Sequence, residues 1–115
     1  MTQNVALDLG WVPSACTLPT TEQPLRVAEF DALFADAVQA VVRPEPTRLR
    51  LELVCSPEHA AQAAELAARE NGCCSFFIFT LTIADGSLVL EVAVPAEHVE
   101  VLDALSERAD AVEPA

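Results

Sequence analysis

The fold is decided by residues 56–94, which read SPEHAAQAAELAARENGCCSFFIFTLTIADGSLVLEVAV. This stretch opens with a strong helix start, because the Ser56 hydroxyl can cap exposed backbone amides and Pro57 fits the first helical position. The alanine-rich run 59–70 continues the helix. Asn71-Gly72 then predicts a left-handed stop at its end.

Two β-rich runs follow this helix. Residues 75–83 and 88–94 are separated by Asp85-Gly86, a sequence typical of a short hairpin turn. Cys73 and Cys74 are therefore expected in the tight junction between the end of the helix and the first of these strands.

A second helix and a further strand are predicted before residue 56. From Leu25 onward, apolar residues recur at steps of three and four, which is the mark of one buried helical face, and this helix should end near Arg43. The residues on that face are Val27, Phe30, Phe34, Ala37, Val38 and Val41. Pro44 and Pro46 force an extended turn, after which the alternation of apolar and charged residues over 48–55 predicts a half-buried strand.

The last helix should begin at Pro95-Ala96-Glu97. Together these elements predict a single α+β domain over 25–111, with three helices and one sheet of about three strands in the order α-β-α-β-β-α. Residues 1–24 are interpreted as an ordered N-terminal arm, in which 5–11 can supply a fourth strand. The closing residues 112–115 are expected to fray.

Charge narrows the range of partners. Eighteen acidic residues face six basic ones, which gives a formal net charge of −12. Such a chain lacks the cationic surface that binds phosphate backbones and would be repelled by anionic lipids, so neither nucleic acid nor a membrane is expected as a partner. The sequence also has no long apolar span and no basic signal-type start, which predicts a cytoplasmic location. The cytosol keeps thiols reduced, so the four cysteines are expected to serve as thiols, metal ligands or nucleophiles rather than as a disulfide framework.

The Cys73-Cys74 pair is the strongest candidate site. Neighbouring α-carbons lie about 3.8 Å apart, less than is usual across a disulfide, so a bond between these two sulfurs would be strained. Two thiolates that converge at the turn would suit a soft ion in a site screened by Phe76 and Phe77. Cys16 would complete a three-thiolate set suited to Hg(II), As(III) or Cd(II) and, with a fourth ligand, to Zn(II). The alternative is that one cysteine packs inward and the other is an inert thiol.

Cys55 and the two histidines are interpreted as structural. Cys55 falls on the apolar face of its strand and is expected in the core, joining the site only if the strand end lies beside the Cys73-Cys74 turn. His59 and His98 occupy the first turns of helices and are expected at the surface. His59 would be an auxiliary ligand only if it folded back toward Cys55.

Other kinds of active site are missing from the sequence. It contains no Gly-rich phosphate loop, no H-E-x-x-H and no nucleophile elbow. The absence of lysine and tyrosine excludes Schiff-base chemistry and phenolic acids. Any enzymatic activity should therefore be thiol chemistry.

Two motifs carry a resemblance to known proteins. The stretch SACTLP at 14–19, followed by GCCSFF at 72–77, resembles a group of small actinobacterial proteins with a Cys-Cys-x-Phe-Phe motif. It is also similar to a C-terminal extension on some regulators of the mercury-resistance type. The resemblance implies heavy-metal or metalloid handling, with Cys16, Cys73 and Cys74 as the matching thiols. Because this chain has no basic helix-turn-helix region, the resemblance does not imply DNA binding.

Three hypotheses follow, and the first is preferred. The protein is a cytosolic binding module that sequesters, senses or transfers a soft metal or metalloid ion through Cys16, Cys73 and Cys74. The runner-up is a cysteine-dependent detoxification enzyme that acts on a metalloid or organometal. The third is a structural or interaction domain, for example a homodimer through a sheet edge, in which the cysteines are incidental.

Overall fold

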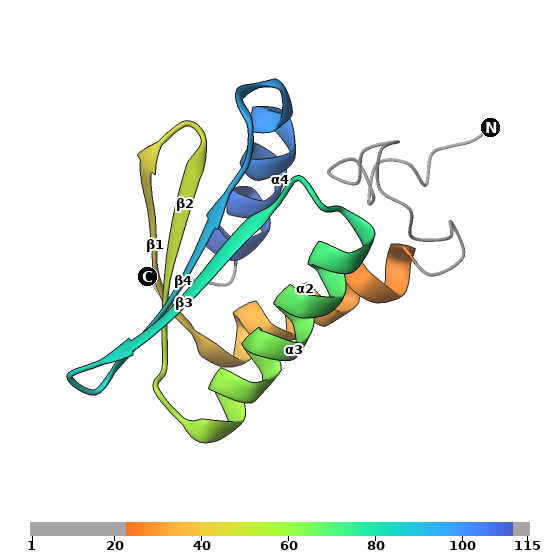
Figure 1. The fold of residues 1–115 in the computed structure, drawn as a ribbon. Helices are drawn as coiled ribbons and strands as arrows, with labels where there is room; N and C mark the ends of the chain where they lie inside the picture. Colours follow the sequence, from red (N-terminus) through yellow and green to blue (C-terminus); the bar gives the residue numbers. More distant parts are fainter. Residues whose placement is uncertain (1–22, 112–115) are drawn as a thin grey trace.

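The computed structural model describes residues 23–111. This part contains three α-helices and a four-strand antiparallel sheet in the order α-β-β-α-β-β-α, so the predicted α+β class is confirmed (Figure 1). In chain order the elements are α2 (Gln23–Ala37), β1 (Val38–Glu45), β2 (Arg48–Leu53), α3 (Pro57–Cys73), β3 (Ile78–Ala84), β4 (Ser87–Ala93), the short 3₁₀ helix η2 (Ala96–His98) and α4 (Val99–Asp110). The predicted N-terminal arm with its strand at 5–11, and the fraying at 112–115, lie outside the described residues.

The predicted extent of the first long helix is wrong. It ends at Ala37 rather than near Arg43, and β1 begins at the next residue. Val38, Val41 and Val42 fit a helical spacing, but β-branched side chains also favour strands, and here they extend along β2 as an antiparallel partner. Residues 23–111 therefore contain four strands, one more than the about three predicted for this part, in a different element order.

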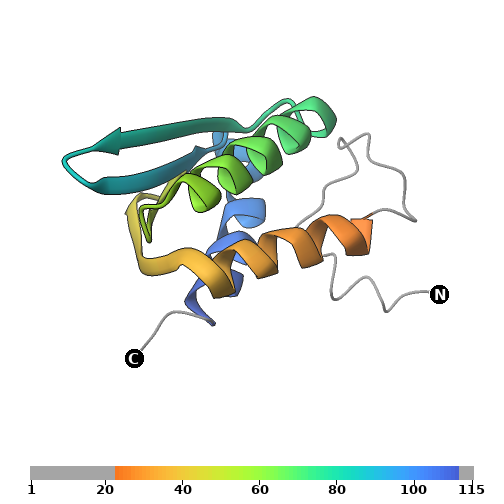
Figure 2. The same ribbon diagram turned by 90° about the horizontal axis from the view of Figure 1, so that it is seen from below.

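The sheet order is β1-β2-β4-β3, so β2 and β4 form its centre and β1 and β3 its edges. A helix followed by a hairpin occurs twice, as α2-β1-β2 and as α3-β3-β4, and the two hairpins meet along β2 and β4. The β3–β4 turn has the predicted hairpin form, because Asp85 and Gly86 both have positive φ, at 52° and 74°. Figure 2 shows α2 (orange) and α4 (blue) below the β3–β4 hairpin (teal).

The core lies between the helices and one face of the sheet. Alternate residues of the central strands point into it, as the period of two requires. They are Leu49, Leu51 and Leu53 of β2 and Leu88, Leu90 and Val92 of β4, all buried. Phe30 and Phe34 of α2, with Leu102 and Leu105 of α4, close the core from the other side. Within residues 23–111, no helix has the length and apolar character needed to cross a bilayer.

Candidate functional site

The second long helix begins as predicted but ends later. Ser56 caps α3, since its Oγ accepts a hydrogen bond from the backbone N–H of His59 at 3.1 Å. The left-handed stop expected at Asn71-Gly72 is wrong: α3 runs through Gly72 and ends at Cys73. Asn71 instead stabilises the turn between α3 and β3, because its Nδ2 donates a hydrogen bond to the carbonyl oxygen of Phe77 at 2.8 Å. Cys73 and Cys74 still occupy the predicted junction between α3 and β3.

The two adjacent cysteines differ in environment. Cys74 is the C-cap of α3, its backbone N–H donates to the Glu70 carbonyl oxygen at 2.7 Å, and its exposure is 0%. Its sulfur forms a disulfide, which departs from the expectation that all cysteines are reduced. Cys73 is half-buried and keeps its thiol. Cys16 lies outside the described residues.

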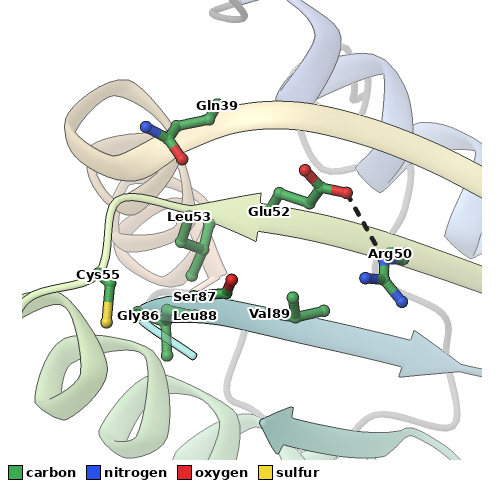
Figure 3. Close-up of a pocket in the computed structure, with 9 residues that line it drawn as sticks. All are labelled: Gln39, Arg50, Glu52, Leu53, Cys55, Gly86, Ser87, Leu88 and Val89. Carbon is green, nitrogen blue, oxygen red and sulfur yellow. Dashed lines mark ion pairs between the residues drawn. The ribbon is translucent and has the colours of Figure 1, made fainter. Parts of the chain in front are cut away.

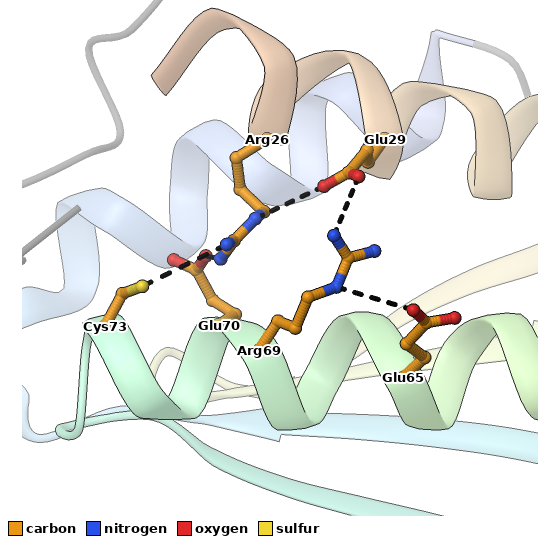
Figure 4. Close-up of polar contacts among 6 residues, drawn as sticks. All are labelled: Arg26, Glu29, Glu65, Arg69, Glu70 and Cys73. Atoms are coloured by element: carbon orange, nitrogen blue, oxygen red, sulfur yellow. Dashed lines mark hydrogen bonds and ion pairs between the residues drawn. The ribbon is translucent and has the colours of Figure 1, made fainter. Parts of the chain in front are cut away.

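A buried ion pair lies beside Cys73 (Figure 4). Arg26 of α2 reaches across to α3, where its Nη1 donates to Glu70 Oε1 at 2.5 Å and its Nη2 donates to Cys73 Sγ at 4.0 Å. Arg26 is 7% exposed and Glu70 is 1% exposed, so both charges are removed from water. Each is costly to bury alone and tolerable only as a pair. The thiol of Cys73 is therefore adjacent to a cation whose charge Glu70 balances.

Three more exposed charged residues lie on one side of this pair. Glu29 of α2 forms an ion pair with Arg26 Nε at 3.3 Å and accepts a hydrogen bond from Arg69 Nη1 at 3.0 Å. Arg69 also lies 3.9 Å from Glu65 on the same helix. The Glu29–Arg69 contact joins α2 to α3 beside the buried pair (Figure 4), but in solvent each of these ion pairs contributes little to stability.

Burial and pairing act in opposite directions on the two charged groups. Burial raises the pKa of Glu70, and the hydrogen bond and positive charge of Arg26 only partly offset this, while Glu29 adds to the rise. Burial alone would lower the pKa of Arg26, but the hydrogen bond and charge of Glu70, with a smaller effect of Cys73, raise it overall. Arg26 therefore stays protonated, and the Glu70 carboxyl loses its proton at a higher pH than an exposed glutamate does.

Replacing Glu70 by glutamine tests this raised pKa. A carboxyl whose pKa is higher in the folded state stabilises the fold most below its ordinary pKa and loses that contribution as the pH rises through the raised value. The unfolding free energy of the wild type should therefore fall relative to that of Glu70→Gln as the pH rises from about 4. Urea unfolding of both proteins at a series of pH values measures the difference. A difference that does not change with pH would contradict the assignment.

The two phenylalanines after the cysteines have separate positions. Phe77 is 2% exposed and belongs to the core, with its ring centroid 4.6 Å from that of Phe76. Phe76 is half-buried, and its ring stacks on the His98 imidazole at 4.1 Å and 24°. His98 is thus not the exposed residue that its position predicts, and its Nδ1 is buried without a hydrogen-bond partner among residues 23–111. Sequence reasoning missed this contact because it joins segments that are distant in the chain.

Cys55 is exposed, so the prediction that it belongs to the core is wrong. Strand β2 ends at Leu53, and the residues after it leave the sheet to begin α3. Cys55 lines a shallow pocket of about 350 Å³ beside the Arg50–Glu52 ion pair (Figure 3). The residues around this pocket are Gln39, Arg50, Glu52, Leu53, Cys55, Gly86, Ser87, Leu88 and Val89.

Cys55 and His59 are remote from the cysteine pair. They flank the start of α3, whereas Cys73 is its last residue. A helix of 17 residues rises about 1.5 Å per residue, which separates its two ends by about 25 Å. His59 is half-buried rather than exposed as predicted, with Nδ1 3.0 Å from the Val54 carbonyl oxygen. Neither residue can therefore supply a ligand at the Cys73-Cys74 turn.

The described residues hold only part of the predicted three-thiolate set. Cys73 and Cys74 are adjacent, while Cys16 lies outside 23–111. Within that range no group of three or more His, Cys, Asp or Glu side chains is arranged to hold a metal ion. Comparison of the chain with protein-family models, curated proteins and solved structures gives no significant match.

Proposed function

We propose that this protein is a cytoplasmic binding module that holds a soft metal or metalloid ion through Cys73 and Cys74, with Cys16 as a third thiolate. The observation that carries the proposal is the placement of two adjacent cysteines at the end of α3, where the Cys73 sulfur faces the Arg26–Glu70 pair. Soft thiolates select ions such as Hg(II), As(III) and Cd(II).

The charges around the turn favour a bound cation. The C-terminal end of a helix carries partial negative charge, and the last turn of α3 has no basic residue to neutralise it. Arg26 can donate a charge-assisted hydrogen bond to a thiolate at Cys73, while Glu70 cancels its positive charge. The net charge of −12 attracts cations to the whole molecule.

Titration of the fully reduced protein with Hg(II), arsenite and Zn(II), followed by thiolate-to-metal absorption, tests the proposal. Because two or three thiolates bind one ion as a chelate, we expect an affinity for Hg(II) or arsenite about 100- to 10,000-fold above that of Cys73→Ser/Cys74→Ser. The matched control is Cys55→Ser, which should bind like the wild type because Cys55 is remote from the turn. Equal affinities in the wild type and the double variant would refute the proposal.

The contact between Arg26 and Cys73 also favours a second candidate, an enzyme in which Cys73 attacks a metalloid or organometal substrate. A cysteine nucleophile is alkylated well below the ordinary thiol pKa of about 8.5, whereas a passive ligand is not. The pH dependence of iodoacetamide labelling, with Cys55→Ser to remove the exposed thiol, separates the two functions.

A further inference from the structure

We propose that two copies of this chain associate through strand β3 and the alanine-rich side of α3, so that their two sheets join into one continuous sheet. This surface, made of β3 and of the exposed alanines of α3 beside it, is called the β3–α3 face below. Such a dimer needs neither an ion nor a thiol, so it is independent of the proposed function.

The two edges of the sheet differ in how readily they can accept another strand. On β1 the pairing with β2 is interrupted by two register shifts, and the strand contains Arg43, Pro44 and Glu45, all features that hinder the addition of a strand. Strand β3 lacks these features, because it pairs with β4 without a shift over all seven residues and contains neither proline nor a charged side chain. Among residues 23–111, no strand pairs with the outer edge of β3.

Apolar side chains of β3 are exposed on both faces of the sheet. Ile78 is 64% exposed and Ile83 is 61% exposed. Ile83 is paired with the buried Leu88 and therefore points to the face that the helices cover. The helices of residues 23–111 thus leave this face uncovered along β3. An open strand edge that bears exposed isoleucines is a template for pairing with another strand.

Helix α3 lies alongside β3 and extends the apolar surface (Figures 1 and 2). On its side toward α2, Arg69 pairs with Glu29. The side toward β3 is uncharged and forms a shallow groove of about 380 Å³ with the strand; the groove is lined by Ala67, Ala68, Asn71, Phe77, Ile78 and Phe79. Ala64 lies one turn before Ala68 and is exposed. Alanines on this side allow a second helix to approach closely.

Charge favours this face as the place where two copies meet. Each chain carries a net charge of −12, so most of its surface repels another copy. A two-fold axis perpendicular to the sheet near Leu81 places β3 antiparallel to its own copy, with no charged side chain of one strand opposite another. The same axis sets the two α3 helices antiparallel, with the positive end of each helix dipole beside the negative end of the other.

The β3–α3 face is large enough for a specific dimer. Strand β3 and helix α3 are each about 25 Å long, and the sheet and helix layers together are about 20 Å deep. Pairing of two such faces buries about 1,000 Å² in total, which is close to the smallest specific interfaces. The association should therefore be reversible and depend on protein concentration.

Sedimentation of the full chain over a range of concentrations tests the dimer. Reductant and EDTA are present, so neither a disulfide through the exposed Cys55 nor a metal ion can join two chains. We expect a concentration-dependent rise toward twice the chain mass of 12.3 kDa. Ile83→Glu should weaken the association by about 100-fold, because it places a carboxylate in an apolar interface. The matched control is Val42→Glu, which changes an exposed residue of the β1 edge and should leave the association unchanged.

A complementary pair of variants tests the same face on the helix. Ala64→Glu and Ala64→Arg both change an exposed residue of α3, so both should fold. Each alone should be monomeric, because like charges meet near the axis, whereas an equal mixture of the two should associate. A wild type that stays monomeric up to about 1 mM would overturn the inference. So would a dimer that persists in Ile83→Glu and in both Ala64 variants, or one that Val42→Glu abolishes.

Discussion

Replacing Arg26 by methionine is expected to lower the unfolding free energy at neutral pH by about 3–5 kcal/mol, because it leaves the Glu70 carboxylate buried without a cation. Glu70 is 1% exposed, so solvent cannot compensate for the lost partner. Urea or guanidinium unfolding measures the effect. Because protonation neutralises Glu70, the loss should shrink as the pH is lowered through its raised pKa.

A double substitution distinguishes the effect of the lost charge from the effect of altered side-chain packing. Arg26→Met combined with Glu70→Met removes both charges and should recover most of the lost stability, since an apolar pair of similar volume often replaces a buried ion pair without loss. Arg69→Met is the matched control: its contacts with Glu29 and Glu65 are exposed, and it should cost less than about 1 kcal/mol. A double variant as unstable as Arg26→Met alone would show that methionine at position 26 fails to pack.

Local signals predicted those parts of the fold that depend on near neighbours. Ser56-Pro57 begins α3 and Asp85-Gly86 forms the hairpin turn, because capping and positive φ are decided within a few residues. The sequence pattern does not predict β1, because its valines fit a helical spacing as well as a strand. Its pairing with β2 decides between the two, and that pairing is a tertiary contact.

The sequence predicts which residues of the candidate site are neighbours along the chain, but not which distant residues meet there. The position of Cys73 and Cys74 at the end of α3 followed from the sequence, whereas the pairing of Arg26 with Glu70 joins residues 44 apart. The sequence does contain one indication of this ion pair. Ala63, Leu66 and Glu70 follow one another at steps of three and four, so Glu70 lies on the buried face of α3 and requires a cationic partner. Sequence alone does not identify which arginine supplies it.

The two phenylalanines of the Cys-Cys-x-Phe-Phe motif differ in burial, and alanine substitutions should therefore differ in their cost to stability. Phe77→Ala is expected to cost about 3–5 kcal/mol, because it leaves a cavity in the core beside Phe79. Phe76→Ala removes a half-buried ring and its stacking on His98, a contact worth about 0.5–1.5 kcal/mol. Chemical unfolding of the two variants, fully reduced and without metal, gives both values.

The Hg(II) affinity of the folded variants then shows whether each ring affects ion binding directly or only through the stability of the fold. Phe77 acts through the core, so Phe77→Leu, which keeps the core filled, should restore both stability and Hg(II) affinity. Phe76 stacks on His98, so Phe76→Leu, which keeps an apolar side chain at this position, should also retain affinity if the ring serves only to exclude water. Loss of Hg(II) affinity in a stable Phe76→Leu protein would show that the aromatic stack itself orients the two cysteines.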